Sequence, residues 1–151
     1  VLSYAVAPIS VAALRKSAPE LARPFRVRGF ALLGPVSFVI AALIVYWSGW
    51  GTVSWLLGLQ ILMFVIYLLC KRLVPTDHLS LGEQVRSSLW LIAFYALTIV
   101  ISYLGSFGGI GALAHPFDTL TVTLMALCIY YWGANTGVPG AKLVLDGDEV
   151  E

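Results

Sequence analysis

The stretch that decides the fold is GFALLGPVSFVIAALIVYWSGWGTVSWLLGLQILMFVIYLLC, residues 29–70, in which no side chain carries a charge. A helix needs about 20 apolar residues to cross roughly 30 Å of bilayer hydrocarbon, at a rise of about 1.5 Å per residue. The stretch is long enough for two such helices, and residues 48–52 in its middle are small and turn-prone. We therefore predict a transmembrane hairpin over residues 29–70, with spans at 30–49 and 54–70.

The rest of the chain continues this pattern. Hydrophobic residues make up 60% of the sequence and charged residues only 11%, whereas a soluble domain is about one-quarter charged. A second hairpin is predicted over residues 87–133, with spans at 87–105 and 117–133, while the apolar residues 1–14 are too short to cross alone and indicate the end of a helix. The predicted fold class is an all-α integral membrane protein, with the end of one transmembrane helix followed by four further transmembrane helices in two hairpins.

The positions of the basic residues predict the orientation of the chain. All nine Lys and Arg residues fall in the connectors 15–28 and 71–86 or in the tail 134–151. The opposite loops, residues 50–53 and 106–116, contain none. Because Lys and Arg resist translocation, both connectors and the C-terminal tail are expected in the cytoplasm, and the protein in the cell (inner) membrane. The net charge of +1 gives no reason to expect a nucleic-acid partner.

Aromatic residues gather near the predicted span ends, as in the aromatic belts of membrane proteins. The expected belt residues are Tyr46, Trp47, Trp50 and Trp55 at the outer boundary, and Phe25, Phe30, Trp90, Tyr130, Tyr131 and Trp132 at the inner one.

The first connector carries a family resemblance. Its helix ends at a basic pair, and two prolines prevent the helix from continuing. The residues concerned are Leu14, Arg15, Pro19, Glu20, Leu21, Arg23, Pro24 and Phe25. In order and spacing they resemble the loop that leaves the tenth transmembrane helix in permeases of the amino acid, polyamine and organocation superfamily. That loop lies in the cytoplasm in the family, which agrees with the orientation predicted from charge.

The resemblance implies that residues 1–14 correspond to the end of helix ten and that the first hairpin corresponds to helices eleven and twelve. Two further spans are similar to the fourteen-helix branch that contains aspartate–proton symporters. The segments that resemble this branch are Ser88-Leu89-Trp90, Ser102-Tyr103-Leu104-Gly105, Pro116-Phe117-Asp118 and Tyr131-Trp132-Gly133.

The function implied by the resemblance is transmembrane transport of an amino acid, by proton-coupled symport or exchange, as the C-terminal part of a larger permease. Family members bind substrate at broken helices that precede the tenth, so the substrate-binding residues are expected upstream of this chain. The implied partners are the lipid bilayer, the missing N-terminal helices, an amino acid and protons. The alternative from a different class is a small helical membrane subunit that acts by helix association, with no transport of its own.

Asp118 is the one acidic residue beside a predicted span outside the cytoplasmic side. It could be a proton-relay carboxylate, as intramembrane acids often are. The favoured interpretation is a helix N-cap at the start of the last span, where a carboxylate accepts hydrogen bonds from free backbone N–H groups.

The glycines of residues 105–111 are not preceded by a strand or followed by the Lys-Ser or Lys-Thr of a phosphate-binding loop. They indicate a flexible outer loop.

The remaining candidates give no expectation of catalysis, metal binding or a cofactor, so an enzyme is not predicted. Asp77, His78 and Glu83 lie close together, but their segment is typical of a solvated turn that leads into the third span. Gln60 is strongly polar within its span and is interpreted as a packing residue, with a pathway role only if the span lines a cavity. Two further residues, Cys70 and Cys128, are interpreted as reduced packing residues.

Overall fold

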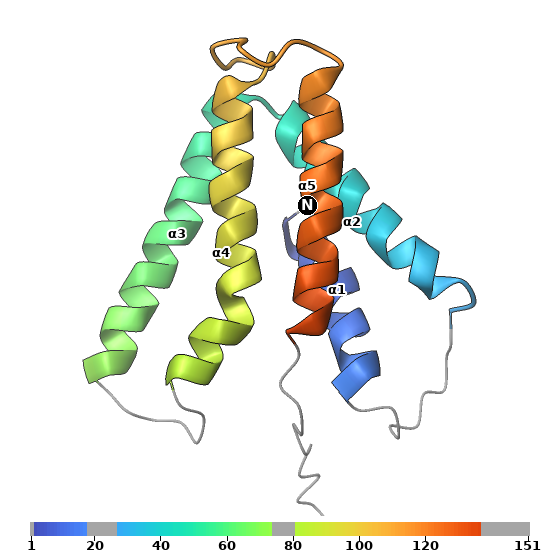
Figure 1. Cartoon of the computed structure of the whole chain (residues 1–151). Helices are drawn as coiled ribbons and strands as arrows, with labels where there is room; N and C mark the ends of the chain where they lie inside the picture. The colour runs from blue at the N-terminus through green and yellow to red at the C-terminus, as the bar shows by residue number, and fades with distance from the viewer. Residues whose placement is uncertain (1, 18–26, 74–80, 137–151) are drawn as a thin grey trace, which may run out of the picture.

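The computed structural model describes residues 2–17, 27–73 and 81–136. Within these ranges the chain forms five α-helices and no strands, which confirms the predicted all-helical class. The helices are α1 (Leu2–Ser17), α2 (Phe30–Trp47), α3 (Trp50–Leu73), α4 (Leu81–Leu104) and α5 (Phe117–Asn135). In Figure 1, α2 and α3 join at the top of the molecule, as α4 and α5 do, and each pair forms a hairpin.

Two of the described helices are long and apolar enough to cross a membrane. These segments are Phe30–Trp47 and Trp50–Cys70, and each has a mean hydropathy of 2.2. The apolar part of α4, Ser88–Leu104, is shorter than a full span. The first turn of α5 holds Asp118, and threonines follow it, so α5 is less apolar than α2. By length and composition, α2 and α3 are thus the two described helices that could each cross a membrane.

The helix boundaries differ in detail from the predicted spans. α1 continues to Ser17, which places Arg15 and Lys16 on its last turn. α3 begins at Trp50, where we expected a span from residue 54, because the reversal needs only Ser48 and Gly49. Gly49 adopts a φ of 83°, a left-handed conformation that glycine enters without steric strain.

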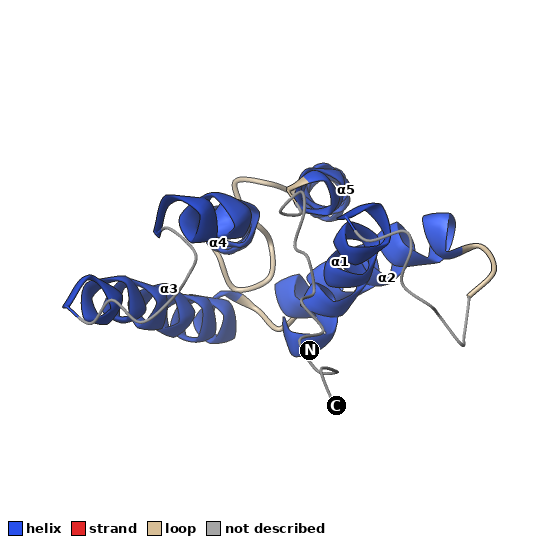
Figure 2. Cartoon of the chain, turned by 90° about the horizontal axis from the view of Figure 1, so that it is seen from below, coloured by secondary structure: helices blue, strands red, loops and turns tan. Residues whose placement is uncertain are grey.

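The core lies between α1, α2, α4 and α5. α5 packs against the other three helices, whereas α3 packs chiefly against α4 and lies at the edge of the bundle, as the view along the helices shows (Figure 2). Phe38 is fully buried at the centre, with its ring centroid 5.1 Å from that of Phe94 and 6.1 Å from that of Tyr130. Tilted aromatic pairs at these separations add to the stabilisation from burial alone.

The described helix ends separate into two groups. The turn end of the bundle contains the α2–α3 turn (residues 48–49) and the α4–α5 loop (residues 105–116), at the top of Figure 1. The connector end, at the bottom, contains the ends of α1, α3 and α5 and the starts of α2 and α4. At this end the Arg15 guanidinium lies 4.2 Å from the centroid of the Phe30 ring, and Lys16 donates a 2.5 Å hydrogen bond to Asn135.

Candidate functional site

A buried carboxylate lies at the turn end of the bundle. Asp118 is fully inaccessible to solvent and is the one charged side chain that is buried among the described residues. Its Oδ2 atom accepts hydrogen bonds from the Tyr46 hydroxyl, at 2.7 Å, and from the Ser106 hydroxyl. Its Oδ1 atom accepts from the backbone N–H of Thr119 at 2.6 Å and from the Thr119 hydroxyl at 3.1 Å. Every partner donates, which matches a carboxylate because a carboxylate only accepts.

The partners of Asp118 come from three parts of the chain. Tyr46 stands on the last turn of α2, Ser106 follows α4, and Thr119 belongs to the first turn of α5. The backbone N–H of Thr119, which donates to the carboxylate, is one of the N–H groups that a helix leaves without a partner at its start. The helix dipole favours negative charge at this end. Asp118 therefore joins the end of α2, the α4–α5 loop and the start of α5.

Gly105 makes room for the Tyr46 hydroxyl. A Cβ atom at position 105 would lie 2.1 Å from the Tyr46 hydroxyl oxygen and 2.9 Å from the Cζ atom of its ring. The Phe107 ring meets the Tyr46 ring edge-on, with the centroids 5.5 Å apart. The glycine that follows α4 thus lets the side chain from α2 reach across to α5.

His115 lies at the edge of the carboxylate site. Its Nδ1 atom is 3.5 Å from the Oδ1 atom of Asp118, while 65% of its side chain remains exposed. The buried acid is therefore bordered by one titratable side chain that faces solvent, and elsewhere by hydroxyl and backbone groups.

The N-cap interpretation of Asp118 is wrong. Pro116 occupies the N-cap position of α5 and makes no side-chain capping hydrogen bond, whereas Asp118 lies within the first turn. Two of its hydrogen bonds reach residues outside α5, which an N-cap does not need. The glycine-rich residues 105–111, expected to form a flexible loop, belong to a loop that is folded back on the bundle, with backbone hydrogen bonds from Ile110 to Tyr103 and from Leu113 to Leu104.

Three of the expected belt aromatics are instead buried. Tyr46, Trp90 and Tyr130 are 0%, 8% and 4% exposed, and all three pack in the core. Periodicity could not reveal this, because α2 carries apolar side chains on every face, which is usual when lipid is the solvent. Trp55 is 83% exposed, as a residue of the outer belt is expected to be.

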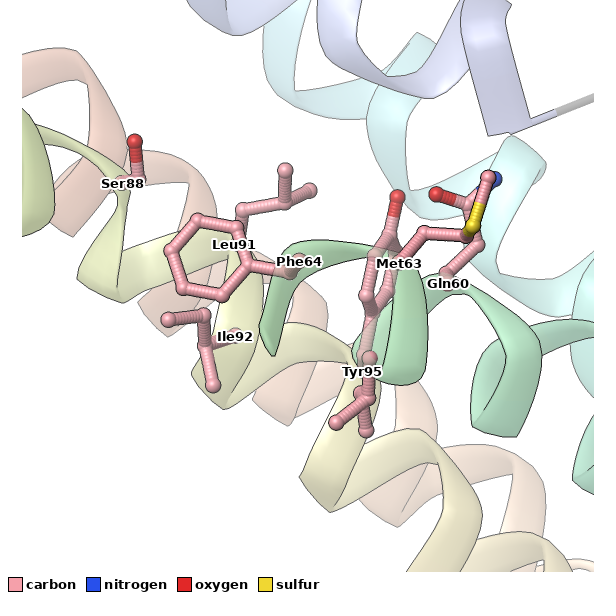
Figure 3. A pocket seen from close by; sticks show the side chains of 8 residues that line it. Gln60, Met63, Phe64, Ser88, Leu91, Ile92 and Tyr95 are labelled. Atoms are coloured by element: carbon pink, nitrogen blue, oxygen red, sulfur yellow. The ribbon is translucent and has the colours of Figure 1, made fainter. Parts of the chain in front are cut away.

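Gln60 lines a cavity between α3 and α4. A pathway role was expected for Gln60 only if its span lines a cavity, and that condition is met. Figure 3 shows Gln60 at one end of this cavity and Ser88 at the other.

Asp77 and His78 fall outside the described residues, and no group of three metal-ligating side chains occurs in the part of the chain that the structure describes. Cys70 and Cys128 are free, exposed thiols.

The chain is similar to two curated transporters of Bacillus subtilis. The chain is 50% identical over 147 residues to the aspartate-proton symporter of Bacillus subtilis (strain 168), which covers 97% of the chain and 28% of that protein. It is 28% identical over 138 residues to the glutamate/serine transporter AimA of the same organism, covering 90% of the chain and 25% of that protein. The chain thus spans about a quarter of the length of these curated relatives. No protein-family model matches the sequence, and no solved structure matches it.

Proposed function

We propose that this chain is the C-terminal part of an amino-acid permease of the amino acid, polyamine and organocation superfamily. The observation that carries the proposal is 50% identity to an aspartate-proton symporter along 97% of the chain. The match to a glutamate/serine transporter supports the same class of activity. Both relatives are named as transporters, which argues against an enzyme and for a location in the membrane.

The permease is proposed to couple amino-acid uptake to protons, in symport or exchange. The names of both relatives include an acidic amino acid, so aspartate and glutamate are the first substrates to test. The substrate site is proposed to lie in helices that precede this chain, as the resemblance to the permease family implies. The cavity between α3 and α4 is lined mainly by apolar side chains such as Phe64, Leu91 and Ile92.

All four helices from α2 to α5 are proposed to cross the bilayer, with the connector end in the cytoplasm. Exposed apolar side chains on every one of these helices support this arrangement; examples are Leu32, Trp55, Val100 and Leu124. A soluble chain rarely exposes apolar surface so continuously. The basic residues Arg15 and Lys16 at the connector end support the orientation.

Transport in liposomes tests the proposal. The complete permease and the 151-residue chain are reconstituted separately, and uptake of labelled aspartate, glutamate, serine and leucine is measured with an inwardly directed proton gradient. The expected result is accumulation of at least one acidic amino acid by the complete permease, abolished by a protonophore, and none by the short chain. Transport by the short chain would contradict a substrate site upstream, and would also exclude the role of a helix-association subunit.

A further inference from the structure

A cavity between α3 and α4 lies apart from the buried carboxylate. Its volume is about 330 Å³, and it lies at the edge of the bundle, where α3 has few neighbours other than α4. Phe64 from α3 and Leu91 and Ile92 from α4 form its apolar wall (Figure 3). A single flexible apolar chain or side chain fits along this wall.

The cavity lies within the depth range of one leaflet of a bilayer. At about 1.5 Å per residue, Gln60 lies about 15 Å along α3 from Trp50, and Ser88 lies about 24 Å along α4 from Leu104. Since the hydrocarbon is about 30 Å thick, the cavity runs from near the middle of the bilayer towards the connector-end boundary. Acyl chains of the leaflet on that side occupy the same range of depth.

The cavity is also open to lipid from the side. Met63, which lines the cavity from α3, is 60% exposed. An apolar space that opens into hydrocarbon is filled by the surrounding solvent, and in a bilayer that solvent is the acyl chain. The cavity can therefore be filled without a ligand that enters from the aqueous phase.

Polar groups mark the two ends of the cavity. Ser88 lies nearest the boundary, and neither its hydroxyl nor that of Tyr95 has a hydrogen-bond partner among the described residues. Tyr95 is only 8% exposed, and together with Gln60 it closes the deep end (Figure 3). A hydroxyl at the depth of Ser88 is placed to donate a hydrogen bond to the ester carbonyl of a phospholipid, whose glycerol backbone lies at that boundary.

We propose that the α3–α4 cavity binds one acyl chain of a phospholipid from the cytoplasmic leaflet, with the ester group at Ser88 and the apolar chain against Phe64, Leu91 and Ile92. This inference rests on the proposed membrane orientation. A bound chain would support α3 along the length where it lacks protein neighbours, and would hold the first hairpin against the second.

Photo-crosslinking tests the lipid site. The complete permease is assembled in nanodiscs that contain phosphatidylglycerol with a diazirine in its acyl chain, and bulk lipid is then removed by washing in dodecyl maltoside. After irradiation, mass spectrometry locates the labelled residues. The expected result is at least fivefold more label on Phe64, Leu91 and Ile92 than on Leu124, which is exposed on α5 and outside the cavity.

Two variants and a control sharpen this test. Ile92→Trp fills the cavity and is expected to lower its label at least fivefold, whereas Leu124→Trp adds the same ring to α5 and leaves the label unchanged. Ser88→Ala retains the cavity and is expected to lower retained lipid about threefold, the effect of one hydrogen bond within a membrane. The readout does not need transport, so its result is independent of the uptake assay.

Label spread evenly over α3, α4 and α5 after washing would overturn the proposal. So would unlabelled cavity residues, which would show that another part of the permease or a second copy covers them. An Ile92→Trp variant that elutes as the wild type on gel filtration and retains its cavity label would also overturn it.

Discussion

The Tyr46 hydroxyl donates a 2.7 Å hydrogen bond to the Asp118 carboxylate, and this bond joins the last turn of α2 to the first turn of α5. Ser106 donates to the same carboxylate oxygen from the loop that follows α4. One buried anion thus fixes the turn end of both hairpins relative to each other. Hydrogen bonds to a charged group are about twice as strong as neutral ones, and they gain further where water is excluded.

Tyr46→Phe tests the strength of this link. The variant removes the hydroxyl and keeps the buried ring, so Asp118 loses one charge-assisted donor. We expect the complete permease to lose about 1.5–3 kcal/mol of stability, the usual contribution of a hydrogen bond to a charged group. The measurement is thermal unfolding in detergent, followed by the loss of monodisperse protein. Tyr103→Phe is the matched control, because Tyr103 is 46% exposed and its hydroxyl has no hydrogen bond among the described residues. Equal midpoints for the two variants would contradict the link.

Asp118→Asn separates a structural carboxylate from a proton-carrying one. The amide keeps the shape of the side chain but turns an N–H donor towards Tyr46, Ser106 or Thr119, all of which donate. Each donor left unpaired in a buried site costs about 1–3 kcal/mol, so we expect a lower yield of folded permease. Proton-driven uptake per folded molecule is expected to stay within twofold of the wild type. Loss of proton coupling in a variant that retains amino-acid exchange would support the proton-relay interpretation instead.

Gly105→Ala introduces a methyl group where the Tyr46 hydroxyl now lies. The clash, at 2.1 Å, must displace the tyrosine from Asp118, and overpacking of this kind costs about 1–3 kcal/mol. Gly58→Ala is the control, because a Cβ atom there meets nothing within 4 Å and alanine favours a helix. In the Gly105→Ala, Tyr46→Phe double variant the clashing hydroxyl is absent. We therefore expect its loss of unfolding midpoint to be smaller than the sum of the two single losses. Strict additivity would show that the two residues do not interact.

The helices could be predicted from the sequence because their signal is local. Uncharged runs located α2 and α3, and the small residues Ser48 and Gly49 located the turn between them. The boundary of α4 was less accurate, since the helix begins at Leu81 and the apolar run only at residue 87. Polar residues can continue a helix beyond the hydrocarbon without changing its hydrogen bonds.

The partners of Asp118 could not be predicted, because they depend on contacts between distant residues. Tyr46 is separated from Asp118 by 72 positions, and it looks like any interfacial tyrosine in the sequence. On an ordinary amphipathic helix the polar face would have shown which side is buried. The side chains of α2 are apolar on every face, so its buried side could be identified only from its packing against the other helices. An acidic residue two positions into an otherwise apolar helix was the available signal, and it suggested a cap.

Labelling of single cysteines tests the central claim, that α2 to α5 cross the bilayer with the connector end in the cytoplasm. Cys70 and Cys128 are first replaced by serine in the complete permease, and one cysteine is then introduced at Val27 in the first connector or at Ala112 in the α4–α5 loop. A membrane-impermeant maleimide is added to intact cells and, in parallel, to permeabilised cells. We predict that Ala112→Cys is labelled in intact cells and that Val27→Cys is labelled only after permeabilisation. Labelling of Val27→Cys in intact cells would contradict the proposed orientation.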